Sequence, residues 1–219
     1  MADIEVEVWD LPLRLWHWML VVLIAFSWWS GTVGGMTLQY HLWSGYAILS
    51  LLWFRIGWGW IGGEHARFVN FIRGPRHVLA SLRELASPRP LAIAGHNPLG
   101  GWMVVALLIA LAVQTTSGLF ANDDIMTEGP LYDKVSKLMS DRLSHLHVIN
   151  FYCLLGLIAV HVLAIAYHRA RKGEQLTQAM VSGRKRLPRG TPAAAPANLW
   201  RAAVLLVVGS GIVALIVNL

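Results

Sequence analysis

The residues of this chain that are best suited to chemistry are its histidines. The sequence has nine of them in 219 residues, and several lie within strongly apolar stretches. Ionisable side chains are costly inside a membrane and usually have a function there. An imidazole is also a frequent metal ligand. Histidines within the apolar stretches are therefore candidate metal ligands or proton carriers.

Four of these histidines form two pairs by depth. His147 and His161 are 14 residues apart on one predicted helix, which places them about 21 Å apart along the axis and within about 40° of the same face. His41 lies at the same end of the predicted bundle as His147, and His17 lies at the same end as His161. The pattern predicts two histidine pairs, one near each membrane surface.

A pair of facing imidazoles is typical of a haem iron that is bound at both axial positions. Such an iron has no open coordination position, which suits electron transfer better than oxygen chemistry. The chain has one cysteine, Cys153, and no CxxCH motif, so attachment through the usual two thioethers is excluded. A single membrane histidine could instead bond to a neighbouring helix. Four membrane histidines that agree in depth and in helix face favour haem ligation.

The other histidines are weaker candidates. His145 is rotated by about 160° from His161, so it is expected to face elsewhere. His168 shares the face of His161 but lies at the basic helix end, where lipid headgroups are expected. The three that remain lie in a basic loop outside the apolar stretches: His65, His77 and His96.

Two arginines lie near the paired histidines. Arg14 is one turn before His17, and Arg55 is 14 residues after His41. A planar guanidinium matches a carboxylate, so both are candidates to bind haem propionates. The alternative is that each side chain extends to the membrane surface. The sequence leaves both interpretations open.

The elements that must position these residues are predicted to be membrane helices. Hydrophobic residues make up 56% of the chain and charged residues 14%, and the mean hydropathy is +0.52. In soluble domains, apolar residues average about 45–50% and charged residues about 25%. An all-α integral membrane protein is predicted, with a four-helix haem-binding bundle and a fifth, C-terminal transmembrane helix. The five apolar stretches are 15–33, 42–61, 99–120, 146–167 and 200–219.

The charges of the loops predict the orientation. Segments 62–98 and 168–199 are rich in lysine and arginine, whereas 121–142 has three basic and five acidic residues. Because positive loops stay in the cytoplasm, the N-terminus is expected in the cytoplasm and the C-terminus on the periplasmic side. The pI near 9.9 is then explained by topology and by anionic lipid headgroups, not by nucleic acid. The acidic outer loop favours a partner with a basic patch.

Four segments of the chain form a recognisable set: RLWHW (14–18), HLWSGYAILSLLWFRIGWGW (41–60), GHNPLGGW (95–102) and HVINFYCLLGLIAVH (147–161). Together they resemble the bacterial cytochrome b561 family, which includes the b-type cytochrome subunits of nickel–iron hydrogenases. The resemblance covers about residues 1–172 and implies a four-helix dihaem domain there. Outside it, charge and hydropathy predict a basic cytoplasmic linker (173–199) and an additional transmembrane helix (200–219).

The resemblance also implies a function. It implies two noncovalent haem b groups that carry electrons between the quinone pool and a periplasmic redox partner, a c-type cytochrome or a hydrogenase, in the respiratory chain of a bacterial inner membrane. The implied axial ligands, His17, His41, His147 and His161, agree with the depth argument. A quinone site near the inner haem is implied, with His96 and Asn97 as candidates. The alternative is that Asn97 caps a helix and His96 is only a loop residue.

Two other classes of protein remain as alternatives. One is a transporter or proton channel with a histidine relay; the positions of the histidines near the two surfaces, not at the midplane, speak against it. The other is a membrane anchor without a redox role of its own. No Walker, GxGxxG, GxSxG or HExxH motif supports a hydrolase or a nucleotide-driven pump. The direction of electron flow and the oligomeric state stay open.

Overall fold

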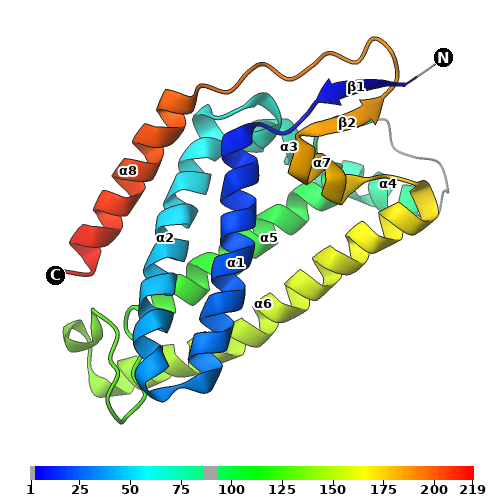
Figure 1. The fold of residues 1–219 in the computed structure, drawn as a ribbon. Helices are drawn as coiled ribbons and strands as arrows, with labels where there is room; N and C mark the ends of the chain where they lie inside the picture. Colours follow the sequence, from blue (N-terminus) through cyan, green and yellow to red (C-terminus); the bar gives the residue numbers. More distant parts are fainter. Residues whose placement is uncertain (1–2, 86–92) are drawn as a thin grey trace. The chain divides into compact units, whose positions relative to one another are not determined.

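The computed structural model describes residues 3–85 and 93–219, so part of the basic segment 62–98 lies outside the described residues. Helices dominate the described structure (Figure 1). The long helices are α1 (Leu11–Val33), α2 (Leu38–Ile61), α5 (Pro98–Gly118), α6 (Lys137–Lys172) and α8 (Leu199–Ile216). The shorter elements are α3 (Phe68–Phe71), α4 (Pro75–Leu85), α7 (Leu176–Ser182), the 3-10 turns η1 (Gly35–Thr37), η2 (Glu64–Ala66) and η3 (Tyr132–Lys134), and the strands β1 (Ile4–Glu7) and β2 (Arg184–Leu187).

Four of the described helices are long and apolar enough to cross a membrane: α1, α5, α6 and α8. This confirms the predicted class, an all-helical membrane protein. Helix α2 has 24 residues, or about 36 Å, which is also a spanning length. It is less apolar than the other four because it contains His41, Arg55 and several aromatic residues. A span through α2 therefore stays a prediction.

Helix α6 is much longer than its apolar stretch. It has 36 residues, or about 54 Å, against a hydrocarbon core of about 30 Å. The charged residues at its two ends continue the helix beyond the apolar part, with Lys137 and Asp141 at one end and Arg169, Arg171 and Lys172 at the other. The sequence prediction of 146–167 found only the membrane portion.

The chain divides into two compact units. The first unit contains the described parts of 1–15, 56–106 and 157–202, and the second contains 16–55, 107–156 and 203–219. The division runs through the long helices, so that each of them contributes residues to both units.

In the first unit, the two short strands form an antiparallel sheet. Glu5 lies opposite Arg186, and Glu7 lies opposite Arg184, so acidic residues of β1 face basic residues of β2. The backbone N–H groups of Val8 and Trp9 also donate to the carbonyl of Gly183. Segment 173–199, which the sequence predicted to be a linker, thus contains α7 and β2 and is bonded to the N-terminal segment.

In the second unit, α8 packs directly on α2. A Cβ atom added at Gly209 would lie 3.1 Å from Cβ of Trp53 and 3.2 Å from the carbonyl oxygen of Ser50. Such a close approach of two helix backbones is typical of membrane helices, where small residues replace the hydrophobic effect as the basis of packing. Other side chains of α8 are exposed, including Val207 and Leu215.

Asp10 bonds the start of α1 to the last part of α2 in the first unit. Its Oδ1 accepts the backbone N–H of Leu13 at 2.8 Å, and both carboxylate oxygens lie 3.2 Å from the indole nitrogen of Trp58, a fully buried side chain. The carboxylate therefore caps one helix and satisfies the polar group of a second helix.

We expect Asp10→Ala to lower the stability by about 1–2 kcal/mol, because a helix cap is lost and a buried indole N–H loses its acceptor. Asp10→Asn keeps an oxygen acceptor at the same place and is the matched control. Thermal unfolding of the detergent-solubilised protein measures the difference. Equal melting temperatures for the two variants would contradict this role of the carboxylate.

Candidate functional site

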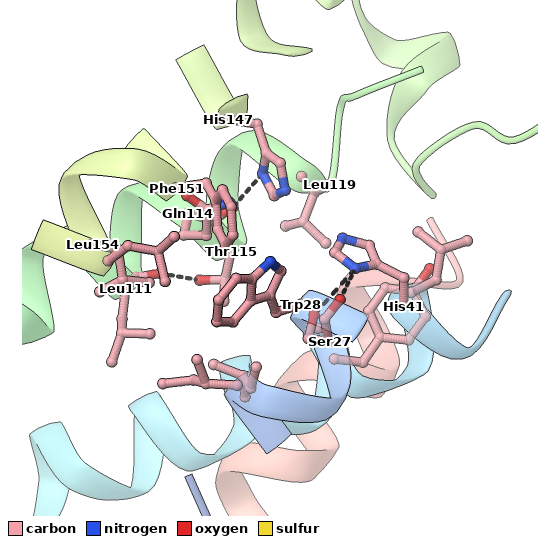
Figure 2. A pocket seen from close by; sticks show the side chains of 17 residues that line it. Ser27, Trp28, His41, Leu111, Gln114, Thr115, Leu119, His147, Phe151 and Leu154 are labelled. Carbon is pink, nitrogen blue, oxygen red and sulfur yellow. Dashed lines mark hydrogen bonds between the residues drawn. The ribbon is translucent and has the colours of Figure 1, made fainter. Parts of the chain in front are cut away.

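His41 of α2 and His147 of α6 face each other in the second unit. Their ring centroids are 6.0 Å apart, and the ring planes make an angle of 79°. Figure 2 shows both side chains directed into one cavity that also receives residues of α1 and α5. The structure therefore brings together the two histidines that the sequence paired near the outer surface. His145, two residues before His147, is exposed.

Each of these rings is held through its Nδ1 atom. His41 Nδ1 donates to the carbonyl of Ser27 at 2.8 Å, with the Ser27 hydroxyl at 3.2 Å. His147 Nδ1 donates to the carbonyl of Gln114 at 2.9 Å, with the Ser117 hydroxyl at 3.2 Å. Since a carbonyl only accepts, the proton of each neutral imidazole belongs on Nδ1. Nε2 then keeps its lone pair, as a metal ligand requires.

Two glycines leave space for the imidazole rings of His41 and His147. A Cβ atom added at Gly31 would lie 2.8 Å from His41 Nδ1, and one added at Gly118 would lie 2.9 Å from Cε1 of His147. Any larger residue would displace the imidazole from its carbonyl partner. The sequence analysis did not identify this constraint on the orientation of the ligands.

The cavity between the four helices is mainly apolar. It encloses about 750 Å³, part of it open to the surroundings. Trp28 and Phe151 form one edge-to-face aromatic contact in its wall, with ring centroids 6.0 Å apart, and Leu111 and Leu154 are among the aliphatic lining residues. An apolar cavity of this size with two convergent imidazoles suits a large, flat and mostly apolar group.

The geometry fits a haem bound by both histidines. Imidazole nitrogens bind first-row metal ions at about 2.0–2.1 Å, which places the centres of two rings on opposite sides of one ion about 6.4 Å apart. The observed 6.0 Å is close to this value. The protonated Nδ1 atoms, the two glycines and the apolar walls agree with the same interpretation.

The other two predicted ligands, His17 and His161, belong to different units. His17 is a half-buried residue of α1 in the second unit, where its ring makes an edge contact with Trp18 at 5.1 Å. His161 is a half-buried residue of α6 in the first unit. The pairing of His17 with His161 stays a prediction.

The two arginines differ in their surroundings. Arg55 is only 1% exposed, and its guanidinium lies 5.6 Å from the ring centroid of Trp16, so its side chain does not extend to the aqueous surface. Arg14 is half-buried and donates through Nη1 to the carbonyl of Val181 at 2.5 Å. The structure thus places Arg14 against the segment before β2, and the propionate role of both arginines stays a prediction.

Asn97 and His96 have different roles in the first unit. Asn97 Oδ1 accepts the backbone N–H of Gly100 at 2.6 Å, so Asn97 caps α5, which is the alternative that the sequence left open. The ring of His96 lies between Trp9 and Phe71, with centroid distances of 4.7 and 4.9 Å. Beside it is a second cavity of about 770 Å³, whose other polar lining residues are His65, Asn70, Arg73 and His77.

Sequence reasoning missed a buried charged cluster beside this second cavity. Oε2 of Glu174 lies 3.5 Å from Nδ1 of His168 and 3.6 Å from Nζ of Lys185, and both His168 and Glu174 are buried. Lys185 also donates to the carbonyl of Ile93 at 3.0 Å, in the loop that lines the cavity. Burial lowers the pKa of Lys185, although the Glu174 carboxylate opposes this effect. The one signal in the sequence was that Glu174 is the single acid within 168–199.

A helical membrane protein with two facing histidines in an apolar cavity belongs to the class of membrane cytochromes. The comparisons with known proteins identify the family. The model of the prokaryotic cytochrome b561 family matches residues 8–183, and the chain belongs to this family. It is therefore a membrane electron-transfer protein that uses haem b, as the sequence resemblance implied.

One curated relative is described as a probable Ni/Fe-hydrogenase B-type cytochrome subunit from Azotobacter chroococcum mcd 1. It is 24% identical to this chain over an alignment of 211 positions, which covers 81% of this chain and 87% of the relative. No solved structure matches the chain.

We expect Gly31→Ala and Gly118→Ala each to weaken haem binding at the His41–His147 site at least about tenfold, because the added methyl group displaces a ring from the carbonyl that orients it. Gly211→Ala in α8, where a Cβ meets open space, is the control. Haem titration of the apoprotein, followed by its absorption spectrum, measures the change. The idea fails if all three variants bind haem as the wild type does.

Proposed function

We propose that this chain is a dihaem b-type cytochrome that carries electrons between membrane quinone and a redox partner at the outer face of a bacterial inner membrane. The observation that carries the proposal is the facing of His41 and His147, each with Nδ1 bonded to a carbonyl of a neighbouring helix. Family membership supports the electron-transfer role.

At the outer site, the protein controls the coordination and the dielectric around the iron. The carbonyls of Ser27 and Gln114 hold the two rings and increase their basicity as ligands. A haem b bound there supplies one-electron redox chemistry. If His41 and His147 both held the iron, no coordination position would be left for oxygen, so the site would favour electron transfer. The walls with Trp28 and Phe151 exclude water and so help to set the potential.

At the inner site, His17 and His161 would be the ligands of a second haem b. Arg55 supports this assignment because a buried guanidinium near the end of α2 away from His41 matches the charge of a propionate. Arg14 is the second candidate for propionate binding. Its observed contact with Val181 also connects this end of α1 with α7.

The quinone site would lie on the same inner side. The cavity beside His96 supports it, because a quinone headgroup needs aromatic neighbours and hydrogen-bond donors to its two oxygens, and Phe71 and the histidines provide both. Asn97 would act there indirectly, through the cap that positions the start of α5.

The orientation follows from charge. Basic segments 62–98 and 168–199 would face the cytoplasm and anionic lipid, with the N-terminus inside and the C-terminus in the periplasm. The three cationic residues in the last turn of α6 support this orientation. In this proposal, residues 1–172 form the dihaem domain and 200–219 an additional span, as predicted.

The outer partner would be a hydrogenase or a c-type cytochrome. The name of the relative from Azotobacter favours the hydrogenase. In that case the chain is the membrane subunit of a larger quinone-linked oxidoreductase, and its outer haem exchanges electrons with the soluble part.

We predict two noncovalent haem b groups per chain. His41→Ala and His147→Ala should each remove mainly the outer haem, and His17→Ala and His161→Ala mainly the inner one, because each substitution removes one axial ligand. The pyridine haemochrome assay and reduced-minus-oxidised spectra measure content and identity. His145→Ala is the control and should keep both groups. A folded protein without haem b bands would contradict the proposed function.

We predict that reporter fusions at Arg83 and Arg186 report the cytoplasm, because both positions lie in basic segments. Fusions at Glu128 and Leu219 should report the periplasm. Paired alkaline phosphatase and green fluorescent protein reporters at each position provide opposite signals and so control for expression. A cytoplasmic Leu219 would mean that α8 does not span the membrane.

A further inference from the structure

The segment between α5 and α6 contains a closed turn, residues 122–128, which we call the tip loop. Asn122 and Glu128 form an antiparallel bridge at its base, and the N–H of Asp123 donates to the carbonyl of Thr127 at 3.1 Å. Oδ1 of Asp123 accepts three backbone N–H groups, from Ile125, Met126 and Thr127, at 3.0, 2.9 and 2.8 Å. These three bonds favour the charged carboxylate and lower the pKa of Asp123 to about 2.

The ends of the tip loop are bonded to segments that carry residues of the cavity with His41 and His147. Just beyond the loop, the N–H of Leu131 donates to the carbonyl of Leu119 at 2.8 Å, and Leu119 lines that cavity (Figure 2). Within the loop, the Asn122 amide donates to the Ser140 hydroxyl at 2.6 Å, on the helix that carries His147. Within the second unit, the tip loop is thus held directly to α6 and, through the residues that follow it, to the segment just after α5.

Two large apolar side chains at the end of this turn are highly exposed. Ile125 is 84% exposed and Met126 is 88% exposed. Carboxylates flank them in the sequence, since Asp123 and Asp124 precede them and Glu128 follows, and all three are exposed or half-exposed. Asp124 pairs with Lys137 at the start of α6, so Glu128 and Asp123 are the acids of this rim that make no ion pair with Lys137. Apolar side chains at the centre of a polar rim are the usual anatomy of a protein-binding site.

The physical chemistry favours a basic protein as the occupant. The backbone of the tip loop is already ordered by its hydrogen bonds, so that binding loses little further entropy. The carboxylates beside Ile125 and Met126 repel anionic lipid headgroups, which opposes insertion into the membrane surface. The same carboxylates attract a surface edged by lysine and arginine and accelerate the encounter with it.

We propose that the tip loop is the docking site for a soluble electron-transfer partner. Ile125 and Met126 bind an apolar patch beside the partner's electron-exchanging edge. Lysine or arginine residues around that patch pair with Glu128 and compete with Lys137 for Asp124. The contact is small, as is usual for transient electron-transfer complexes. This inference rests on the proposed function, because it requires a haem between His41 and His147.

The experiment measures electron transfer from the full-length reduced protein in phosphatidylcholine nanodiscs. The probe is a small soluble c-type cytochrome whose haem edge is ringed by lysines, followed by stopped-flow absorbance at low and high ionic strength. The double variant Ile125→Ser/Met126→Gln should lower the second-order rate constant at least about fivefold at both ionic strengths, since apolar contact is insensitive to salt. Asp124→Asn/Glu128→Gln should lower it mainly at low ionic strength.

Met36→Gln is the matched control, because Met36 is an equally exposed methionine (92%) in the turn between α1 and α2. Its rate should equal that of the wild type. A double variant Ile125→Ser/Met126→Gln that transfers electrons within about twofold of the wild-type rate would overturn the proposal, because it would leave only the carboxylates as the docking surface.

Two further measurements test whether lipid or a second copy of the chain covers the tip loop instead. A fluorophore on Met126→Cys, in a Cys153→Ser background, should emit as in water; blue-shifted emission in nanodiscs without the probe would place the tip loop in lipid and overturn the proposal. The mass of the solubilised particle should be the same for Ile125→Ser/Met126→Gln and wild type; a halved mass would make a second copy the occupant. Wild-type protein without haem b bands would overturn the proposed function, and the docking proposal with it.

Discussion

The bond between each imidazole Nδ1 and a main-chain carbonyl of another helix is the constraint on which the haem site depends. His41 of α2 is tied in this way to Ser27 of α1, and His147 of α6 to Gln114 of α5. A helical carbonyl oxygen has a second lone pair, so it can accept the imidazole without losing its bond within the helix. Because one nitrogen is fixed, the other is aimed into the cavity, and the glycines that make room for the rings follow from the same requirement.

The pairing of His41 with His147 could be predicted because it needs only the position of each residue along its own helix, which follows from the rise per residue. Which carbonyl accepts each Nδ1 depends on how two helices are rotated against each other, and a single sequence does not contain that information. The predicted cap at Asn97 could be named, but its geometry could not be distinguished from a quinone contact.

The structure of the first unit was harder to predict because its elements are short and pair over long separations. Strand β1 alternates apolar and acidic residues, but β2 reads RKRL and has no alternation of period two. Their pairing joins segments about 180 residues apart, and opposite charge across the ladder is visible only once the register is known. For the same reason the sequence predicts only a basic cytoplasmic linker over 173–199, although Glu174 and Lys185 of this segment form a buried cluster with His168.

Burial of charge also explains why α2 differs from the four helices that are clearly apolar enough to span a membrane. It contains the two polar residues, His41 and Arg55, that the proposed function assigns to iron and to a propionate, and each lowers the hydropathy of the helix. The structure compensates for the arginine locally: the Trp16 indole donates to the carbonyl of Leu51 at 2.8 Å, which fixes the ring whose centroid lies 5.6 Å from the guanidinium carbon of Arg55. A cation beside an aromatic ring, away from water, is stabilised by the ring's electrostatic field. The lower hydropathy of α2 thus agrees with the proposal that this helix carries haem-binding groups, because ionisable side chains in a membrane helix usually have a function.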